Sequence, residues 1–335
     1  LKSGAMISMG GTTLAAGEYQ LLTTKDDLKD ITSPAKTIST ITWATGVVTV
    51  TLSAAHGWNV GNTIPLVVSG VTPAAYNRAV TATVTTSTAF TYPLATDPGT
   101  ATVMGTVKTV AANEIIEMNT TFWSQGTTRA VYVLELGDVS VAAAVAALAD
   151  FIDEDISLGN TYQKFFSYLV PREWDGEPTF KTLTGLYTSP ASLVYFFVTT
   201  TIATYQAWVA TKNKSVLAGV ESPNIPAGEF SMAFPFQSSL ANDPGSSNMV
   251  PPMAYRFGYG VTEYPVEGNG TLLKQLQDNS INYVGTAAEG GLSNKMQVAG
   301  HMLDGNPFNY WYSVAWTAIN LELDLANEII NGSNT

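Results

Sequence analysis

The chain has 335 residues, of which 45% are apolar and only 13% are charged. It is long enough for two or three domains with real cores. Charged side chains make up about a quarter of a typical soluble domain and normally coat its surface. The surface here must therefore consist largely of Thr, Ser, Asn, Gly and Ala. Either the protein is secreted or surface-exposed, or copies of the same chain cover much of it.

The charge and the residue inventory exclude several classes of function. The net charge is −12, whereas direct binding of nucleic acid needs a basic stripe. There is no cysteine, which excludes disulfides and zinc–cysteine sites. No stretch reaches the ~18 consecutive apolar residues of a membrane-spanning helix.

In the first 109 residues the pattern is mostly that of short strands. Residues 19–24 predict a strand, and a short helix follows from Thr24. Residues 37–109 hold few charges, much Thr and Val, and no helical periodicity, which predicts a small all-β sandwich or barrel. We expect this module to be an insertion with its ends close together, in a host domain made of residues 1–36 and 110–335. Its predicted strands are residues 40–43, 47–52, 64–69, 79–86, 90–92 and 101–107.

From Val110 onward the pattern becomes α/β. Residues 129–136 read as a strand buried on both faces, and Val141 to Ile152 mark one face of a helix. Strands and helices then alternate, which predicts parallel crossovers and a mixed or doubly wound, largely parallel sheet. The further predicted elements are strands at 164–170, 193–200, 215–220, 282–284 and 295–298, helices at 204–211, 226–234 and 271–278, and an element at 255–261 that is given no type.

The last thirty residues predict a long amphipathic helix. A turn at Asp304-Gly305 and Pro307 precede it, and Asn331-Gly332 is a C-terminal stop. Apolar residues recur in steps of three and four, which predicts one buried face along the whole helix. They are Phe308, Tyr312, Ala315, Ile319, Leu323, Ala326 and Ile330.

This stretch also carries specific residues that periodicity alone does not explain. It contains the Asp304-Gly305 turn, Tyr310-Trp311-Tyr312, Trp316, Ile319-Asn320-Leu321 and a closing Asn331-Gly332-Ser333-Asn334. In this it resembles the signature of a family of contractile-phage tail proteins, long catalogued as of unknown function, whose members are similar to tail sheath subunits. The module at residues 37–109, with Tyr76-Asn77, more loosely resembles small β modules that phage tail proteins carry as insertions.

The resemblance implies a structural subunit of a contractile tail sheath. Such subunits assemble as six-membered rings stacked helically around a tail tube, and the lattice contracts to drive genome delivery. The implied partners are copies of the chain itself, the tail tube protein, and baseplate and tail terminator proteins, without direct contact to nucleic acid or membrane. The implied location is the virion tail, after assembly in the host bacterial cytoplasm. Family members continue past the Asn-Gly-Ser-Asn, so we expect a C-terminal continuation beyond Thr335.

Few side chains could carry chemistry. His56 lies in the β module, and His301 is followed by Asp304, a carboxylate that a catalytic base would want nearby. The acids Asp150, Asp153, Glu154 and Asp155 sit on one helix and read as a solvated or partner-facing patch. Glu173, Asp175 and Glu177 surround Trp174 and are a slightly better candidate for a divalent cation.

None of these groups forms a convincing constellation. We therefore predict no enzyme, no catalytic residues, and no residues that bind a cofactor or a metal. Two other hypotheses remain open. One is a surface-exposed adhesion or carbohydrate-binding protein that uses the β module. The other is an enzyme acting on polysaccharides, for which Trp174 between Glu173 and Asp175 is the only indication.

Overall fold

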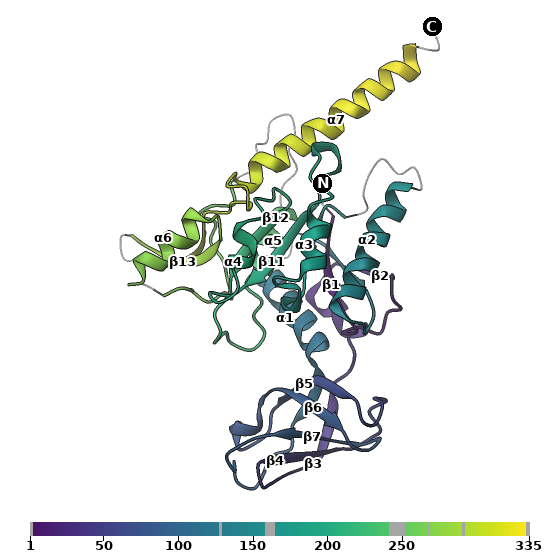
Figure 1. Ribbon diagram of the computed structural model, residues 1–335, viewed down its shortest axis with the longest axis vertical. Coiled ribbons are helices and arrows are strands. Elements are labelled where there is room, and N and C mark those ends of the chain that lie inside the picture. The colour runs from purple at the N-terminus through teal and green to yellow at the C-terminus, as the bar shows by residue number, and fades with distance from the viewer. Residues whose placement is uncertain are drawn as a thin grey trace. The chain divides into compact units, whose positions relative to one another are not determined.

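The computed structural model describes residues 3–126, 129–157, 165–240, 252–266, 268–289 and 292–332. The chain divides into two compact units. The first contains Leu1–Met9, Leu14–Asp30 and Ile116–Thr335, and the second contains Gly10–Thr13 and Ile31–Ile115. The first is α/β and the second is all-β (Figure 1). The predicted mixed α/β host with an inserted small β domain is thus confirmed.

The second unit is a closed barrel of six antiparallel strands. Alternation builds it: Val48, Val50 and Leu52 of β4 are buried, and the Thr residues between them face outward. Closure leaves no free strand edge. The strands, in barrel order, are β3 (Lys36–Ala44), β4 (Val47–Leu52), β7 (Ala89–Pro93), β6 (Arg78–Val84), β5 (Thr63–Ser69) and β8 (Thr106–Thr109).

The predicted last strand of the module, residues 101–107, is displaced. The strand β8 pairs with both β3 and β5, which closes the barrel. Val103, before it, makes only an isolated bridge to Thr72. A glycine is needed where the chain enters β8, because a Cβ on Gly105 would lie 1.9 Å from the Ser69 carbonyl oxygen.

The first unit is built on a six-stranded sheet in which all neighbours are parallel except β2 and β9. The predicted largely parallel sheet is therefore confirmed, with one antiparallel strand at its edge. The strands, in sheet order, are β12 (Val216–Val220), β11 (Tyr195–Thr200), β10 (Ser167–Leu169), β1 (Gly4–Ser8), β9 (Val131–Glu135) and β2 (Tyr19–Leu22). Lys164, placed by the sequence in the β10 strand, lies outside the described residues.

Both faces of this sheet are covered, which is why every residue of β11 is buried. On one face Phe196 packs against Phe180, with ring centroids 5.5 Å apart. On the other face Phe197 packs against Phe236, also at 5.5 Å. The covering helices are α2 (Val141–Ser157), α3 (Pro178–Thr184) and α4 (Gln206–Val209) with the first face, and α5 (Ala233–Leu240) with the second.

Sequence patterns missed α1 (Val110–Ser124) and α3, and placed α5 too early, at residues 226–234. Thr109 caps α1, since its Oγ1 accepts a hydrogen bond of 3.1 Å from Ala112 N. Other elements match predicted positions or extend them: α6 (Gly270–Asp278), the antiparallel pair β13 (Tyr283–Glu289) and β14 (Leu292–Val298), the terminal α7 (Phe308–Gly332), and the short 3-10 helix η1 (Lys25–Asp30). The sequence analysis gave no bounds for β1 and did not predict the short 3-10 helices η2 (Ala74–Tyr76), η3 (Arg172–Trp174) and η4 (Pro190–Ser192).

Among the residues that the structure describes, no helix combines the length and the apolarity needed to cross a membrane.

Candidate assembly surface

The first two turns of α7 are packed into the core of the α/β unit. Phe308, Tyr312 and Ala315 are buried. The Phe308 ring lies 4.9 Å from that of Tyr195 and 6.0 Å from that of Phe197, both on β11. This part of the predicted buried face is therefore confirmed, and we call Phe308–Ala315 the anchored half of the helix.

Polar contacts hold the same end of the helix in place. Trp311 donates a hydrogen bond of 2.7 Å from Nε1 to Asp304 Oδ2. The ammonium of Lys214 lies 4.6 Å from the centroid of the Trp311 ring, within the range of a cation–π interaction. The start of α7 is thus fixed by packing, by hydrogen bonding and by a charge.

Asn282 ties the chain in front of α7 to the edge strand β12. This fully buried side chain donates from Nδ2 to the carbonyl oxygens of Ala218 (2.9 Å) and His301 (2.8 Å). Its Oδ1 accepts from the backbone nitrogens of Gly300 (2.7 Å) and His301 (2.9 Å). All four bonds that an amide side chain can make in this way are formed.

The second half of α7 contradicts the prediction of a continuous buried face. In Figure 1 it runs out beyond the other elements of its unit, so none of them covers it. Five large apolar side chains there are 38–72% exposed. We call them the assembly surface: Leu321, Leu323, Leu325, Ile329 and Ile330.

These side chains form two apolar stripes rather than one. At 100° per residue, Ile319, Leu323, Ala326 and Ile330 continue the anchored face, whereas Leu321, Leu325 and Ile329 form a second stripe. A helix that is apolar on more than one side is normally buried. The only charged residues between Ser313 and Gly332 are Glu322, Asp324 and Glu328. The assembly surface is therefore apolar with an acidic rim.

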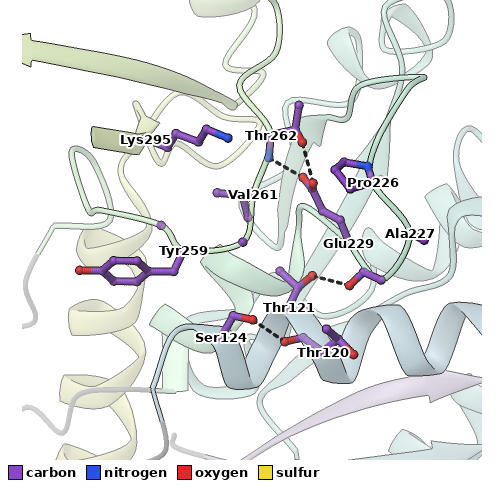
Figure 2. Close-up of a pocket in the computed structure, with 13 residues that line it drawn as sticks. Thr120, Thr121, Ser124, Pro226, Ala227, Glu229, Tyr259, Val261, Thr262 and Lys295 are labelled. Atoms are coloured by element: carbon purple, nitrogen blue, oxygen red, sulfur yellow. Dashed lines mark hydrogen bonds between the residues drawn. The ribbon is translucent and has the colours of Figure 1, made fainter. Parts of the chain in front are cut away.

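The same unit also contains an open pocket of about 490 Å³ (Figure 2). Hydroxyl groups of α1, the loop through Glu229, the backbone at residues 258–262 and Lys295 of β14 line it. The buried Glu229 carboxylate accepts two hydrogen bonds of 2.6 Å from Thr262, one from N and one from Oγ1, and a third of 3.1 Å from Ser231 Oγ. The Glu229 carboxylate at the wall of the pocket thus links two loops by hydrogen bonds.

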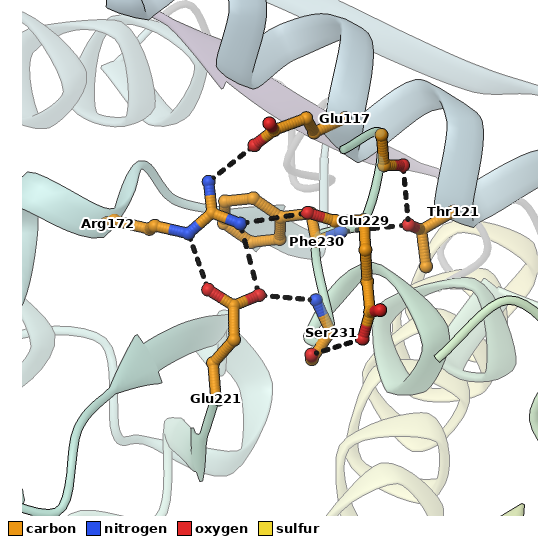
Figure 3. Close-up of polar contacts among 8 residues, drawn as sticks. Glu117, Thr121, Arg172, Glu221, Glu229, Phe230 and Ser231 are labelled. Atoms are coloured by element: carbon orange, nitrogen blue, oxygen red, sulfur yellow. Dashed lines mark hydrogen bonds and ion pairs between the residues drawn. The ribbon is translucent and has the colours of Figure 1, made fainter. Parts of the chain in front are cut away.

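A cluster around Arg172 occupies the carboxyl edge of the sheet, where open α/β folds usually bind ligands (Figure 3). Its guanidinium donates to Glu221 (2.5 and 3.1 Å), to Glu117 Oε2 (2.7 Å) and to the Glu229 carbonyl oxygen (3.0 Å). The Arg172 guanidinium carbon also lies 4.3 Å from the centroid of the Phe230 ring. The chain's own side chains therefore fill this edge and join β10, β12 and α1.

The two histidines take structural positions. His56 is buried and stacks on Trp58 at 4.6 Å, its Nδ1 accepts a hydrogen bond from Trp58 N, and its Nε2 lies 2.8 Å from the Thr86 carbonyl oxygen. His301 forms an isolated bridge with Pro307. The carboxylate of Asp304 accepts from Asn306 and Trp311, so the structure does not bring it to His301.

The predicted acidic candidates are also separated by their contacts. Asp175 accepts hydrogen bonds from Thr200, Thr204 and Trp208, while Glu177 caps α3 through Thr179. Burial, and then the charge of Asp138, raises the pKa of Glu173. In the described part of the chain, no three or more His, Asp or Glu side chains are grouped so that they could hold a metal ion.

In the predicted helical patch, Asp153 accepts a hydrogen bond of 2.7 Å from the Tyr187 hydroxyl, and Asp150 is exposed. The side chains of Glu154 and Asp155 lie outside the described residues. The sequence analysis missed Arg172, Asn282 and Glu229 altogether. Apart from the contact of Glu229 with Ser231, their partners lie 18 to 64 residues away along the chain, so no local spacing could have indicated them.

Comparison with known proteins adds little to this geometry. No family model matches the chain, and no curated protein does. Among solved structures, the sheath tail protein of Desulfitobacterium hafniense is similar at a TM-score of 0.41 and 11% identity, over 98% of this chain and 79% of that one. A likeness of this size determines neither the fold nor the function of the chain.

Proposed function

We propose that this protein is a structural subunit of a contractile phage tail sheath. It assembles with copies of itself into hexameric rings stacked around a tail tube, and the lattice contracts to drive genome delivery. Its partners are then the tube, baseplate and tail terminator proteins, and its place is the virion tail. It works by binding, and not by catalysis.

The exposed half of α7 is the observation that carries this proposal. Five large apolar side chains are exposed to solvent on a helix whose other end is packed into a core. Burying them against other copies removes apolar area from water, which stabilises association by about 25 cal/mol per Å². The low charge of the chain fits repeated coverage, because a lattice then buries few ions without partners. The resemblance of residues 304–334 to phage tail proteins supports a tail sheath as the kind of lattice.

The test is assembly of the purified chain, followed by sedimentation velocity over a range of concentrations and by negative-stain microscopy. We expect rings, tubes or sheath-like polymers at high concentration. The double variant Leu325→Asp/Ile329→Asp should remain a folded monomer at concentrations where the unmodified chain assembles, because two carboxylates cannot be buried in an apolar contact.

A control is Val60→Asp, which puts one such carboxylate on a similarly exposed apolar residue of the β-barrel unit. It should assemble as the unmodified chain does. Monomers of the unmodified chain at every salt and protein concentration would contradict the proposed function, as would equal loss of assembly in both variants.

A further inference from the structure

The three acids in the outer half of α7, Trp316–Gly332, occupy two different kinds of position. Each residue advances by about 100° around the helix axis, so neighbours on the surface lie three or four positions apart in the chain. Around Glu322 these four positions are taken by Ala318, Ile319, Leu325 and Ala326. The carboxylate of Glu322 is therefore flanked only by apolar side chains.

The other two acids, Asp324 and Glu328, lie on the polar side of the same helix. They are four positions apart and adjacent on the surface, and the amides and the threonine of the outer half fall beside them. The residues of this polar side are Thr317, Asn320, Asp324, Asn327, Glu328 and Asn331. Asp324 and Glu328 thus border the assembly surface, whereas Glu322 does not.

Glu322 lies between the two apolar stripes of the outer half. It falls about 60° around the axis from Leu325 on one side and about 60° from Ile319 on the other. The stripes and Glu322 together span about 200°, roughly twice the apolar width of an ordinary surface helix. We call this face the apolar arc. Its members, in order around the helix, are Leu321, Leu325, Ala318, Ile329, Glu322, Ala326, Ile319, Ile330 and Leu323.

In a single copy the carboxylate of Glu322 is exposed to water. This end of α7 extends beyond the other described elements of its unit, so none of them faces it (Figure 1). On the helix itself the nearest titratable groups, Asp324 and Glu328, are turned away by about 160° and 120°. No lysine or arginine of the described residues forms a salt bridge with Glu322, and α7 contains no base.

We propose that assembling copies of the chain bury the apolar arc as one continuous face, enclosing Glu322, and that association therefore takes up a proton. An arc of about 200° must be covered on both sides of Glu322 before its leucines and isoleucines leave water. A carboxylate that loses its water without gaining a base is favoured in its neutral form. The inference rests on the proposed function, and it names the face of α7 that is covered and a dependence of assembly on pH.

The chain's composition favours proton uptake over an ion pair across the contact. A second copy carries only 15 lysines and arginines among 335 residues, so few of its surfaces can place a base opposite Glu322. With one proton taken up, association strengthens as the pH falls, by at most about tenfold per pH unit for each contact. Falling pH also reduces repulsion between copies of net charge −12, so the test needs a reference that shares this effect.

The matched pair Glu322→Gln and Asp324→Asn supplies that reference. Each variant removes one negative charge from an exposed position of the same helix, with little change of shape. Sedimentation velocity at about pH 7.5 measures the concentration at which assembly begins. We expect this onset to fall about tenfold in Glu322→Gln, because no carboxylate has to leave water. In Asp324→Asn it should stay within about twofold of the unmodified chain.

The pH profile is the second readout. Between about pH 7.5 and pH 5.5 the onset should fall less steeply in Glu322→Gln than in the unmodified chain or in Asp324→Asn. Circular dichroism below the onset checks that α7 stays helical in each variant.

Three results would contradict the inference in different ways. Equal onsets and parallel profiles for the two variants would show that Glu322 stays in water, which overturns the inference and leaves the proposed function standing. A higher onset for Glu322→Gln would show that a base of the partner meets the carboxylate, with the same consequence. Failure of the unmodified chain to assemble at any pH and concentration would overturn the proposed function as well.

Discussion

The two halves of α7 carry similar residues in different surroundings. In the anchored half, aromatic side chains pack on β11 and are covered. In the outer half, leucine and isoleucine at helical spacing are exposed, on a stretch of helix that runs beyond the other described elements of its unit. Apolar periodicity therefore predicts that a helix forms and which of its faces should be buried. It does not show whether the surface that buries such a face belongs to the same molecule or to another copy.

The largest difference between the two halves is expected in the free energy of unfolding, when one apolar side chain is truncated in each half. Phe308→Ala leaves a cavity between α7 and β11 and should lower the free energy of unfolding by about 3–5 kcal/mol. Leu325→Ala removes an exposed side chain and should change it by less than about 0.5 kcal/mol. The measurement is urea denaturation followed by circular dichroism, at concentrations below the onset of assembly.

Equal destabilisation by the two substitutions would break the comparison, because the outer half would then be covered within the monomer. Ala318→Gly and Ala326→Gly serve as helix-propensity controls in the outer half. Each should cost the helix about 1 kcal/mol, which amide exchange of α7 can detect. The free energy of unfolding of the whole unit should stay unchanged in these two variants, because no core contact is lost.

Sequence analysis recovered the elements whose signals are local. The strands β9, β10, β11 and β12 of the parallel sheet lie in apolar runs, the barrel strands alternate, and α7 has a helical period and a C-terminal stop signal, so each was predictable. The strand β1, GAMIS, is short and was not assigned. The helix α1 was missed because acids and amides interrupt its apolar side and its cap is a single threonine. The displaced last barrel strand depends on closure, which pairs β8 with two strands far away in the chain.

The candidate surfaces were predictable only in part. The aromatics and leucines of α7 were recognised, but their exposure is a fact of tertiary structure. An element was predicted at residues 255–261, but the exposure of Tyr255, Phe257 and Tyr259 was not. Its alternation appears only once the backbone is paired with β14. Whether a side chain is inward or outward depends on the partner strand, and a single sequence does not contain that information.

A smaller effect is expected from the amide that fixes the base of α7. Asn282→Ala leaves the buried backbone nitrogens of Gly300 and His301 without their acceptor, which should cost about 1–3 kcal/mol. Amide exchange should rise in the anchored half, measured against the outer half as an internal reference. The control Asn279→Ala removes an exposed amide that bonds only to Gln275 O within the described contacts, and it should leave α7 unchanged. An unchanged anchored half in Asn282→Ala would show that packing alone holds it.

The smallest and most specific effect concerns the hydroxyl of Tyr195 under the anchored half. Burial, and then the neighbouring Tyr312, holds the pKa of Tyr195 well above its usual value of 10.0. The folded state therefore keeps this proton after the unfolded state has released it. Its contribution to stability is complete below pH 10 and is lost as the pH rises from there toward the folded pKa.

The Tyr195→Phe variant isolates this contribution. Among the described residues the buried hydroxyl has no hydrogen-bond partner, so its removal should cost little at pH 7. Above pH 10 the free energy of unfolding of the variant should fall less steeply than that of the unmodified chain. Tyr310→Phe, an exposed position on the same helix, should keep the original slope. Since Tyr195 packs edge-to-face against Phe308 and stacks on Tyr312, amide exchange at alkaline pH should rise in the anchored half first. Parallel pH profiles for Tyr195→Phe and the unmodified chain would show that this hydroxyl reaches water in the folded state.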